Sequence, residues 1–214
     1  MKEEQIKLFE KWRPEYKNFI PDGIVDERAY LDSPIKILYL LKEVNGGENW
    51  DLCEFLKNGG RGQTWNNITR WTIGIYQPDT AWSEIEKINF DNETRKEILK
   101  KICVVNVKKE SGKGSSNNKE LATAVERDKD RLKKQLAIYE PDFILCCGTG
   151  WLYEKIYEFD NAIWKSTSNG IKFFRSDKTV VIAYSHPQKR ATKRSLYEEL
   201  TDAVKEIQGK NKTA

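Results

Sequence analysis

Residues able to do chemistry stand at the ends of short apolar runs in this 214-residue chain. Glu43 follows the first run, Asn106 lies near the end of the second, and His186, the chain's single histidine, follows the last. The third run ends in a glycine-containing turn at 148–150. A carboxylate, an amide and an imidazole at such positions can together move protons and stabilise charge. The four runs are 35–41, 102–107, 142–147 and 179–184.

Each of these three side chains has a role that suits its type. The Glu43 carboxylate can position water or stabilise a developing cation. Asn106 presents a donor and an acceptor side by side, which matches the amide-like edge of a nucleobase. A neutral His186 can donate to an oxyanion that forms on a leaving group. Aromatic residues between the first two runs add stacking surfaces, so the set describes a pocket for a flipped-out nucleobase. They are Trp50, Phe55 and Trp65.

Helices between the apolar runs are needed to bring these residues together. Apolar side chains recur at helical spacing over 121–139, and shorter helical patterns cover 64–75 and the chain start to about residue 20. Strands that alternate with helices indicate a parallel sheet with ligands beyond its carboxyl edge. We therefore expect one α/β domain spanning 1–214, a three-layer α/β/α fold around a mostly parallel four-stranded sheet. A short two-stranded or irregular stretch is expected near 170–175.

Local signals predict where other elements begin and end. Asn92 is expected to cap a short helix, and Ser195 opens the capping-box pattern of the last helix. The end of that helix is expected to fray over about 208–214. The polar, glycine-containing segments 42–62 and 108–119 are predicted to be long loops, the first with one short helical turn at most.

Basic residues cluster directly after His186, although the net charge of the chain is only +4. A cluster of this kind can contact the phosphates of a nucleic acid, which bind cations without regard to sequence. The four residues predicted to contact DNA phosphates are Lys189, Arg190, Lys193 and Arg194.

The composition argues against several classes of protein. No apolar run reaches membrane-spanning length and the first residues do not form a signal peptide, so we expect a cytoplasmic monomer without a membrane partner. None of the four cysteines forms a C-x-x-C pair, so no metal site and no cofactor is expected. The adjacent Cys146 and Cys147 should point to opposite faces of a strand.

Four short motifs follow one another across residues 35–200. In type, order and spacing they resemble the motifs of the uracil-DNA glycosylase superfamily. That family carries a water-activating motif after the first strand, an asparagine that reads uracil, a strand followed by a glycine-containing turn, and a final histidine–proline pair. The matching segments here are Lys42-Glu43-Val44-Asn45-Gly46, Val104-Val105-Asn106-Val107-Lys108, 141–148, and Ser185-His186-Pro187-Gln188.

The resemblance implies an activity and a role for each site residue. The protein would hydrolyse the N-glycosidic bond of uracil or another deaminated base in single- or double-stranded DNA. The catalytic residues would be Glu43, which positions water or stabilises the oxocarbenium-like sugar, and His186, which stabilises charge on the departing base. Asn106 would read the base edge, Phe55 would stack on the ring, and Asn45 would also bind the base. The reaction would need no cofactor.

Three positions depart from the family pattern and keep other functions open. Lys42 stands where the family has glycine, Asn45 where it has proline, and Gln188 where it has serine. The first two positions shape the water-binding turn in active members, and the cysteine ligands of the iron–sulfur branch are missing. One alternative is therefore a non-catalytic superfamily member that binds a nucleobase or nucleic acid. A third is an unrelated α/β enzyme acting on a small phosphorylated ligand.

Overall fold

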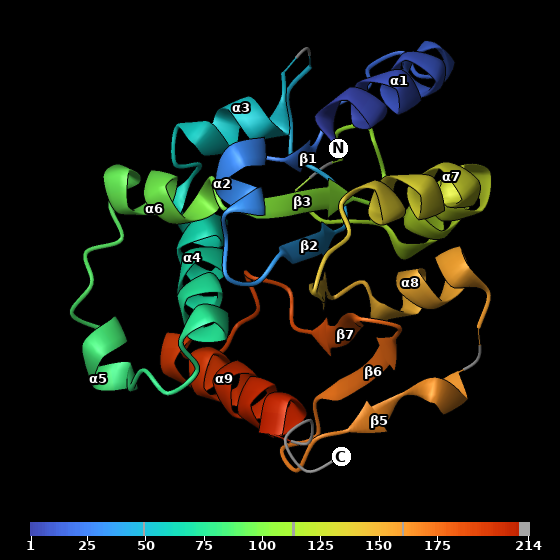
Figure 1. Ribbon diagram of the computed structural model, residues 1–214. Helices are drawn as coiled ribbons and strands as arrows, with labels where there is room; N and C mark the ends of the chain where they lie inside the picture. Colours follow the sequence, from blue (N-terminus) through green and yellow to red (C-terminus); the bar gives the residue numbers. More distant parts are fainter. Residues whose placement is uncertain (49, 113, 160, 210–214) are drawn as a thin grey trace.

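A mixed β-sheet of seven strands lies at the centre of the described residues in the computed structural model (Figure 1). The strands are β1 (Gly23–Ile24), β2 (Ile37–Leu41), β3 (Ile102–Asn106), β4 (Phe143–Cys147), β5 (Lys165–Ser166), β6 (Lys172–Ser176) and β7 (Thr179–Tyr184). Their spatial order is β1-β3-β2-β4-β7-β6-β5. The structure describes residues 1–48, 50–112, 114–159 and 161–209.

The four strands predicted from the sequence are confirmed as β2, β3, β4 and β7, which pair in parallel as neighbours. Their apolar, β-branched residues are buried on both faces, as in other parallel sheets that helices cover on both sides. The prediction of a mostly parallel four-stranded sheet is nevertheless wrong in strand number, and the sheet is mixed because half of its strand pairs are antiparallel. Antiparallel β1 extends one edge, and the β6–β5 pair extends the other. The stretch expected near 170–175 is confirmed as β6 and its short partner.

Helices cover both faces of the sheet and give the predicted three layers (Figure 1). They are α1 (Lys2–Trp12), η1 (Arg13–Glu15), α2 (Glu27–Leu31), α3 (Leu52–Lys57), α4 (Gly62–Tyr76), α5 (Trp82–Ile85), α6 (Asn92–Leu99), α7 (Asn118–Ile138), α8 (Gly150–Tyr157), η2 (Asn161–Ile163) and α9 (Lys193–Gly209).

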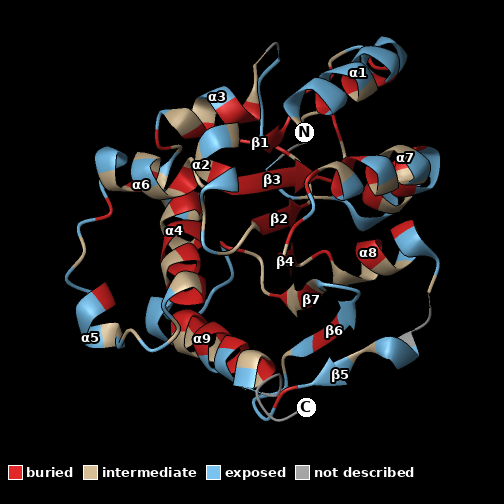
Figure 2. Ribbon diagram, in the orientation of Figure 1, coloured by how far each residue is buried: buried red, intermediate tan, exposed pale blue. Residues whose placement is uncertain are grey.

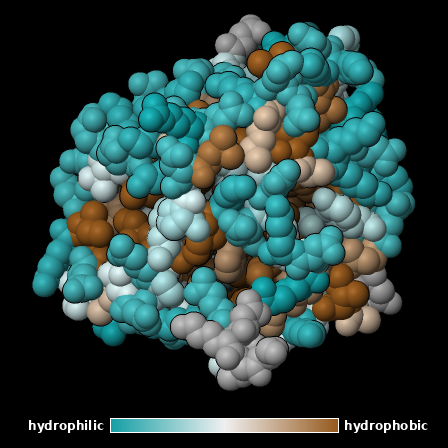
Figure 3. Space-filling view, in the orientation of Figure 1, coloured by the Kyte–Doolittle hydropathy of each residue, from teal (hydrophilic) through white to brown (hydrophobic). Residues whose placement is uncertain are grey.

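Two hydrophobic clusters join the layers. The cluster under α1, α7 and α8 contains Trp12 and Cys146, while the cluster under α4 and α9 contains Trp71 and Cys147. The two adjacent cysteines therefore point to opposite faces, as predicted. Figure 2 shows burial concentrated in the sheet and on the inner helix faces, and Figure 3 shows hydrophilic side chains over most of the visible surface.

The helix starts correct two of the sequence-based expectations. Asp91, not Asn92, caps α6, because its carboxylate accepts the Thr94 N–H at 2.9 Å. The last helix begins at Lys193, and Thr192 rather than Ser195 supplies the first-turn acceptor. The predicted loop 42–62 contains the two-turn helix α3. Of the tail expected to fray, residues 208 and 209 continue α9, and 210–214 lie outside the described residues.

A buried ion pair fixes the backbone at the carboxyl end of β3. Asp22 and Lys109 both have fully buried side chains, with Lys109 Nζ 2.8 and 2.7 Å from the two carboxylate oxygens. Asp22 also accepts the backbone N–H of Asn106 and the side-chain amide of Gln135, each at 2.7 Å. Burial lowers the pKa of Lys109, although the adjacent carboxylate opposes that shift. Through Asp22, the segment before β1 is therefore connected both to the backbone of Asn106 and to Lys109, three residues further along the chain.

We expect Lys109→Met to lower the free energy of unfolding by about 3–5 kcal/mol, because it leaves Asp22 as an unpaired buried charge. Urea denaturation followed by tryptophan fluorescence measures this change. Lys7→Met is the matched control, since it removes only an exposed ion pair with Glu3 and should leave stability nearly unchanged. Equal losses in the two variants would contradict the assigned role of the buried pair.

Candidate functional site

A cavity of about 890 Å³ lies at the carboxyl ends of β2, β3 and β7. All five residues predicted to be catalytic or base-binding line it, although they come from distant parts of the chain. Its volume falls in the range of small-molecule sites. The five residues are Glu43, Asn45, Phe55, Asn106 and His186.

Asn106 is the buried polar residue of this cavity. It is the last residue of β3 and is 3% exposed. Its backbone N–H is held by Asp22, but its side-chain Oδ1 has no hydrogen-bond partner among the described residues. A buried acceptor without a partner costs about 1–3 kcal/mol, and such an atom in a cavity lining is positioned to receive a ligand's N–H group.

His186 follows β7 and presents a defined tautomer when neutral. Its Nδ1 accepts the backbone N–H of Gln188 at 3.2 Å, so the proton of a neutral ring is on Nε2. Burial and, secondarily, the positive charge of Lys42 lower the pKa of His186 below its ordinary value of 6.5. The side chain is therefore a neutral hydrogen-bond donor at physiological pH.

The loop after His186 is attached to the start of α4. The carbonyl of Pro187 accepts a hydrogen bond from Asn67 Nδ2, and Gln188 Nε2 donates to Thr64 Oγ1, both at 2.7 Å. Gln188 thus connects two walls of the cavity. These contacts hold the histidine loop against the helix that forms the opposite wall.

Glu43 lines the cavity, but its carboxylate is already engaged. Lys108 Nζ lies 2.8 Å from Glu43 Oε2, and the two side chains are 13% and 5% exposed. Burial alone would lower the pKa of Lys108, but Glu43 and the more exposed Glu120 raise it. An ammonium group at this distance competes with any water molecule or sugar that approaches the same carboxylate oxygen.

Gly112 lies directly over the Glu43 carboxylate, in a position where only a residue without a side chain fits. A Cβ atom placed on Gly112 would overlap the carboxylate carbon and both of its oxygens. The Gly112 N–H donates to the Val44 carbonyl at 2.8 Å, and Asn45 and Gly112 form a short parallel bridge. The segment after β3, which was predicted only as a loop, therefore packs over the segment Lys42-Glu43-Val44-Asn45-Gly46.

Two partly exposed aromatic residues form one side of the cavity. The rings of Trp50 and Phe55 meet edge to face, with centroids 5.4 Å apart and planes at 75°. Trp50 Nε1 also donates to the Gly46 carbonyl at 3.1 Å. Trp65 lines the same space but is buried in the core under α4, so it is mainly a packing residue. Phe55 and Trp50 both remain available for stacking.

The four residues predicted to contact phosphates are all exposed, and they lie beside the cavity, not in its lining. They are Lys189, Arg190, Lys193 and Arg194. Arg194 is paired with Glu198, and Lys189 Nζ approaches Ser185 Oγ at 3.3 Å. Arg190 and Lys193 have no ion pair among the described residues.

Arg61 is an exposed cation in the cavity lining that the sequence analysis missed. It precedes the first turn of α4, where no side chain caps the helix. The available sequence signal was an arginine within the run Gly59-Gly60-Arg61-Gly62. Lys108 and Gly112 were missed as partners of Glu43 for a different reason, because only the fold brings them to it.

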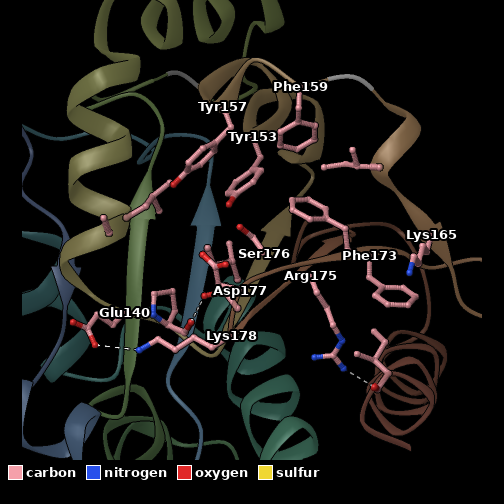
Figure 4. A pocket seen from close by; sticks show the side chains of 18 of the residues that line it. Glu140, Tyr153, Tyr157, Phe159, Lys165, Phe173, Arg175, Ser176, Asp177 and Lys178 are labelled. Carbon is pink, nitrogen blue, oxygen red and sulfur yellow. Dashed lines mark hydrogen bonds and ion pairs between the residues drawn. The ribbon is translucent and has the colours of Figure 1, made fainter. Parts of the chain in front are cut away.

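A second hollow, of about 1100 Å³, lies between α7, α8 and β6 (Figure 4). Figure 4 shows Tyr153 and Tyr157 at one end, while Lys178 at the other lies 3.3 Å from a carboxylate oxygen of Glu140. Arg175 donates to a backbone carbonyl of α9 at 2.7 Å. Lys178 and Arg175 thus have partners within the protein, and no residue predicted to be catalytic or base-binding lines this hollow.

Among the described residues, no group of histidine, cysteine and acidic side chains is arranged to hold a metal ion. The four cysteines are buried, and burial raises the pKa of each thiol. Within the same part of the chain, no helix has both the length and the apolar character needed to cross a membrane.

No protein-family model matches the chain, and no curated protein matches its sequence.

We expect Gly112→Ala to destabilise the protein by about 1–3 kcal/mol, because the new methyl group must displace Glu43 or the loop that covers it. Gly114→Ala is a close control, since a Cβ there meets no atom within 4 Å. Chemical denaturation of both variants measures the difference. Similar stability of the two would show that the cover over Glu43 is loose.

Proposed function

We propose that the protein is a DNA N-glycosylase that releases uracil or a related deaminated base from a flipped nucleotide. The observation that carries this proposal is the buried, unpaired Oδ1 of Asn106 in a cavity that also holds a neutral histidine and a carboxylate. An acceptor in that position selects a ligand with a ring N–H group. The family resemblance supports the same conclusion, because all four motifs contribute residues near this edge of the sheet.

The chemistry of deamination explains why Asn106 would select such bases. Cytosine and adenine present a ring nitrogen acceptor beside an amino donor. Deamination of these two bases converts this edge to a ring N–H donor beside a carbonyl acceptor, as in uracil and hypoxanthine, and xanthine presents the same donor–acceptor pair. The carboxamide of Asn106, with Oδ1 as the acceptor, is complementary to this edge. With cytosine or adenine, Oδ1 would instead face a second acceptor, the ring nitrogen.

The other cavity residues would divide the reaction between the sugar and the base. Phe55 or Trp50 would stack on the flipped ring, which every base tolerates, and Asn45 at the exposed rim would contact the base edge. Glu43 would position water or stabilise the positive charge that develops on the sugar. His186 would donate from Nε2 to the base oxygen that gains negative charge as the glycosidic bond breaks.

The basic residues beside the cavity would hold the DNA backbone. Arg190 and Lys193, together with Arg61 at the cavity, have no carboxylate partner among the described residues, so their charges are available to phosphates. Lys189 and Arg194 would also contact phosphates after their contacts with Ser185 and Glu198 are broken. Such contacts position the duplex or single strand without reading its sequence.

A base-release assay tests the proposed activity. Labelled single-stranded and duplex oligonucleotides carrying uracil, hypoxanthine or xanthine are incubated with protein, and abasic sites are cleaved with alkali. We expect release by the wild type, and losses of about 10²–10³-fold in His186→Ala and Glu43→Gln. Asn106→Ala should lose release of all three bases, whereas Asn89→Ala on the exposed surface should not. Absence of release from every wild-type reaction would overturn the proposal.

The salt dependence of DNA binding tests the phosphate contacts. The Arg190→Ala/Lys193→Ala double variant should bind a uracil oligonucleotide more weakly at low salt. The slope of log affinity against log salt should fall by about 0.7–0.9 for each phosphate contact that is lost. Fluorescence anisotropy measures both quantities. The control is the Lys7→Ala/Lys11→Ala double variant on α1; an equal change in that protein would show only an effect of net charge.

A second candidate function is base or DNA binding without cleavage. The specific observation that favours it is the ion pair of Glu43 with Lys108, beneath Gly112, because it occupies the carboxylate that hydrolysis needs. A binding protein would bind DNA with a salt-dependent affinity and would protect a uracil oligonucleotide from nuclease digestion, but it would not release the base. Lys108→Met distinguishes the two functions further, since freeing Glu43 changes release in an enzyme and leaves a binder inactive.

A further inference from the structure

The side chains of Lys42 and His186 both lie next to Gly148, in the turn that follows β4. A Cβ atom built on Gly148 would be 3.7 Å from Lys42 Cε and 3.6 Å from His186 Cβ. Gly148 has a φ of +71°, and its N–H donates to the Tyr184 carbonyl at 2.7 Å, which holds the turn against the end of β7. The turn thus brings the lysine that follows β2 beside the histidine that follows β7, and both line the cavity.

The carboxylates of the cavity already have partners, whereas Lys42 has none among the described residues. Glu43 is paired with Lys108, and Glu54 with Lys57 at the exposed end of α3. Asp51 caps α3 by accepting the backbone N–H of Glu54 at 3.1 Å. The positive charge of Lys42 is therefore not neutralised by any of these groups and faces the cavity with the histidine.

We propose that Lys42 is a catalytic residue that stabilises the departing base as an anion, with His186 as its hydrogen-bonding partner. This inference rests on the proposed base excision. In that reaction the bond between C1′ and the base nitrogen breaks, and both bonding electrons stay on the base. Water supplies the oxygen that bonds to C1′, and its proton passes to Glu43. The negative charge left on the base carbonyl then lies beside the Lys42 ammonium.

The two side chains would contribute different parts of the stabilisation. Neutral His186 donates one directed hydrogen bond, whereas Lys42 contributes a full positive charge in a partly desolvated cavity. The same charge disfavours protonation of the histidine. Other charges around His186 are Glu43, held by Lys108, Arg61 at the start of α4, and Lys189 on its own loop. The position that departs from the family's glycine would thus add a cation to the site.

Binding of a free base anion tests this role without any cleavage step. The probe is 5-nitrouracil, which changes its absorbance when it ionises, titrated across pH against uracil as the neutral reference. Wild-type protein should bind the anion more tightly and lower the apparent pKa of the bound probe. Lys42→Met should lose about tenfold or more in affinity for the anion and keep its affinity for uracil. Lys42→Arg should retain most of the preference.

The matched control is Lys7→Met, which removes a lysine already paired with Glu3 on α1, outside the cavity lining, and should leave anion binding unchanged. His186, as the chain's single histidine, supplies a structural readout by NMR. Its pKa should rise in Lys42→Met because the nearby positive charge is gone. An unchanged histidine titration and unchanged preference for the anion in Lys42→Met would overturn the proposal.

Base release separates failure of this inference from failure of the proposed function. If the wild type releases uracil and Lys42→Met releases it equally fast, the activity stands and the role of Lys42 is wrong. In the expected result, Lys42→Met loses more activity on uracil than on 5-fluorouracil, whose anion is the better leaving group. If no base is released but Lys42 still determines anion binding, hydrolysis fails as the function while the anion site remains.

Discussion

The parallel register of four neighbouring strands is the constraint on which the site depends. Leu41 pairs with Asn106, and Cys147 pairs with Tyr184, so the carboxyl ends of these strands reach the same level. Residues that directly follow the strands are then forced into one region, however distant they are in sequence. The buried Asp22–Lys109 pair reinforces this arrangement at β3, because the same carboxylate that binds the lysine also holds the backbone of Asn106.

Around that fixed edge, the site contains both unpaired and paired polar groups. The Oδ1 of Asn106 and the charge of Lys42 lack partners among the described residues, which suits a ligand with a ring N–H group and a carbonyl that can accept negative charge. Glu43 has the opposite character, since Lys108 neutralises it and Gly112 covers it. Under the proposed function, the groups that would recognise the base are therefore free to bind it, whereas the carboxylate that would activate water is already paired and covered.

Much of the fold and the clustering of the site residues could be predicted from the sequence because both follow from periodic patterns. Apolar runs identified the four parallel strands, and the position of Glu43, Asn106 and His186 after them implied a common edge. The pairing of Lys108 with Glu43 could not be predicted, because it arises from the path of a loop whose composition carries no period. Edge strands as short as β1 and β5 likewise leave almost no pattern.

The two ends of the sheet also bear on how the protein behaves at high concentration. A sheet edge exposes backbone groups that can pair with another chain, and long, flat edges promote aggregation. Here both outermost strands have only two residues, and β5 places Lys165 on its exposed surface. A neighbouring molecule would find few consecutive backbone groups and a charge in the way. Edges this short would be expected to limit pairing of this mixed sheet with the strands of another molecule.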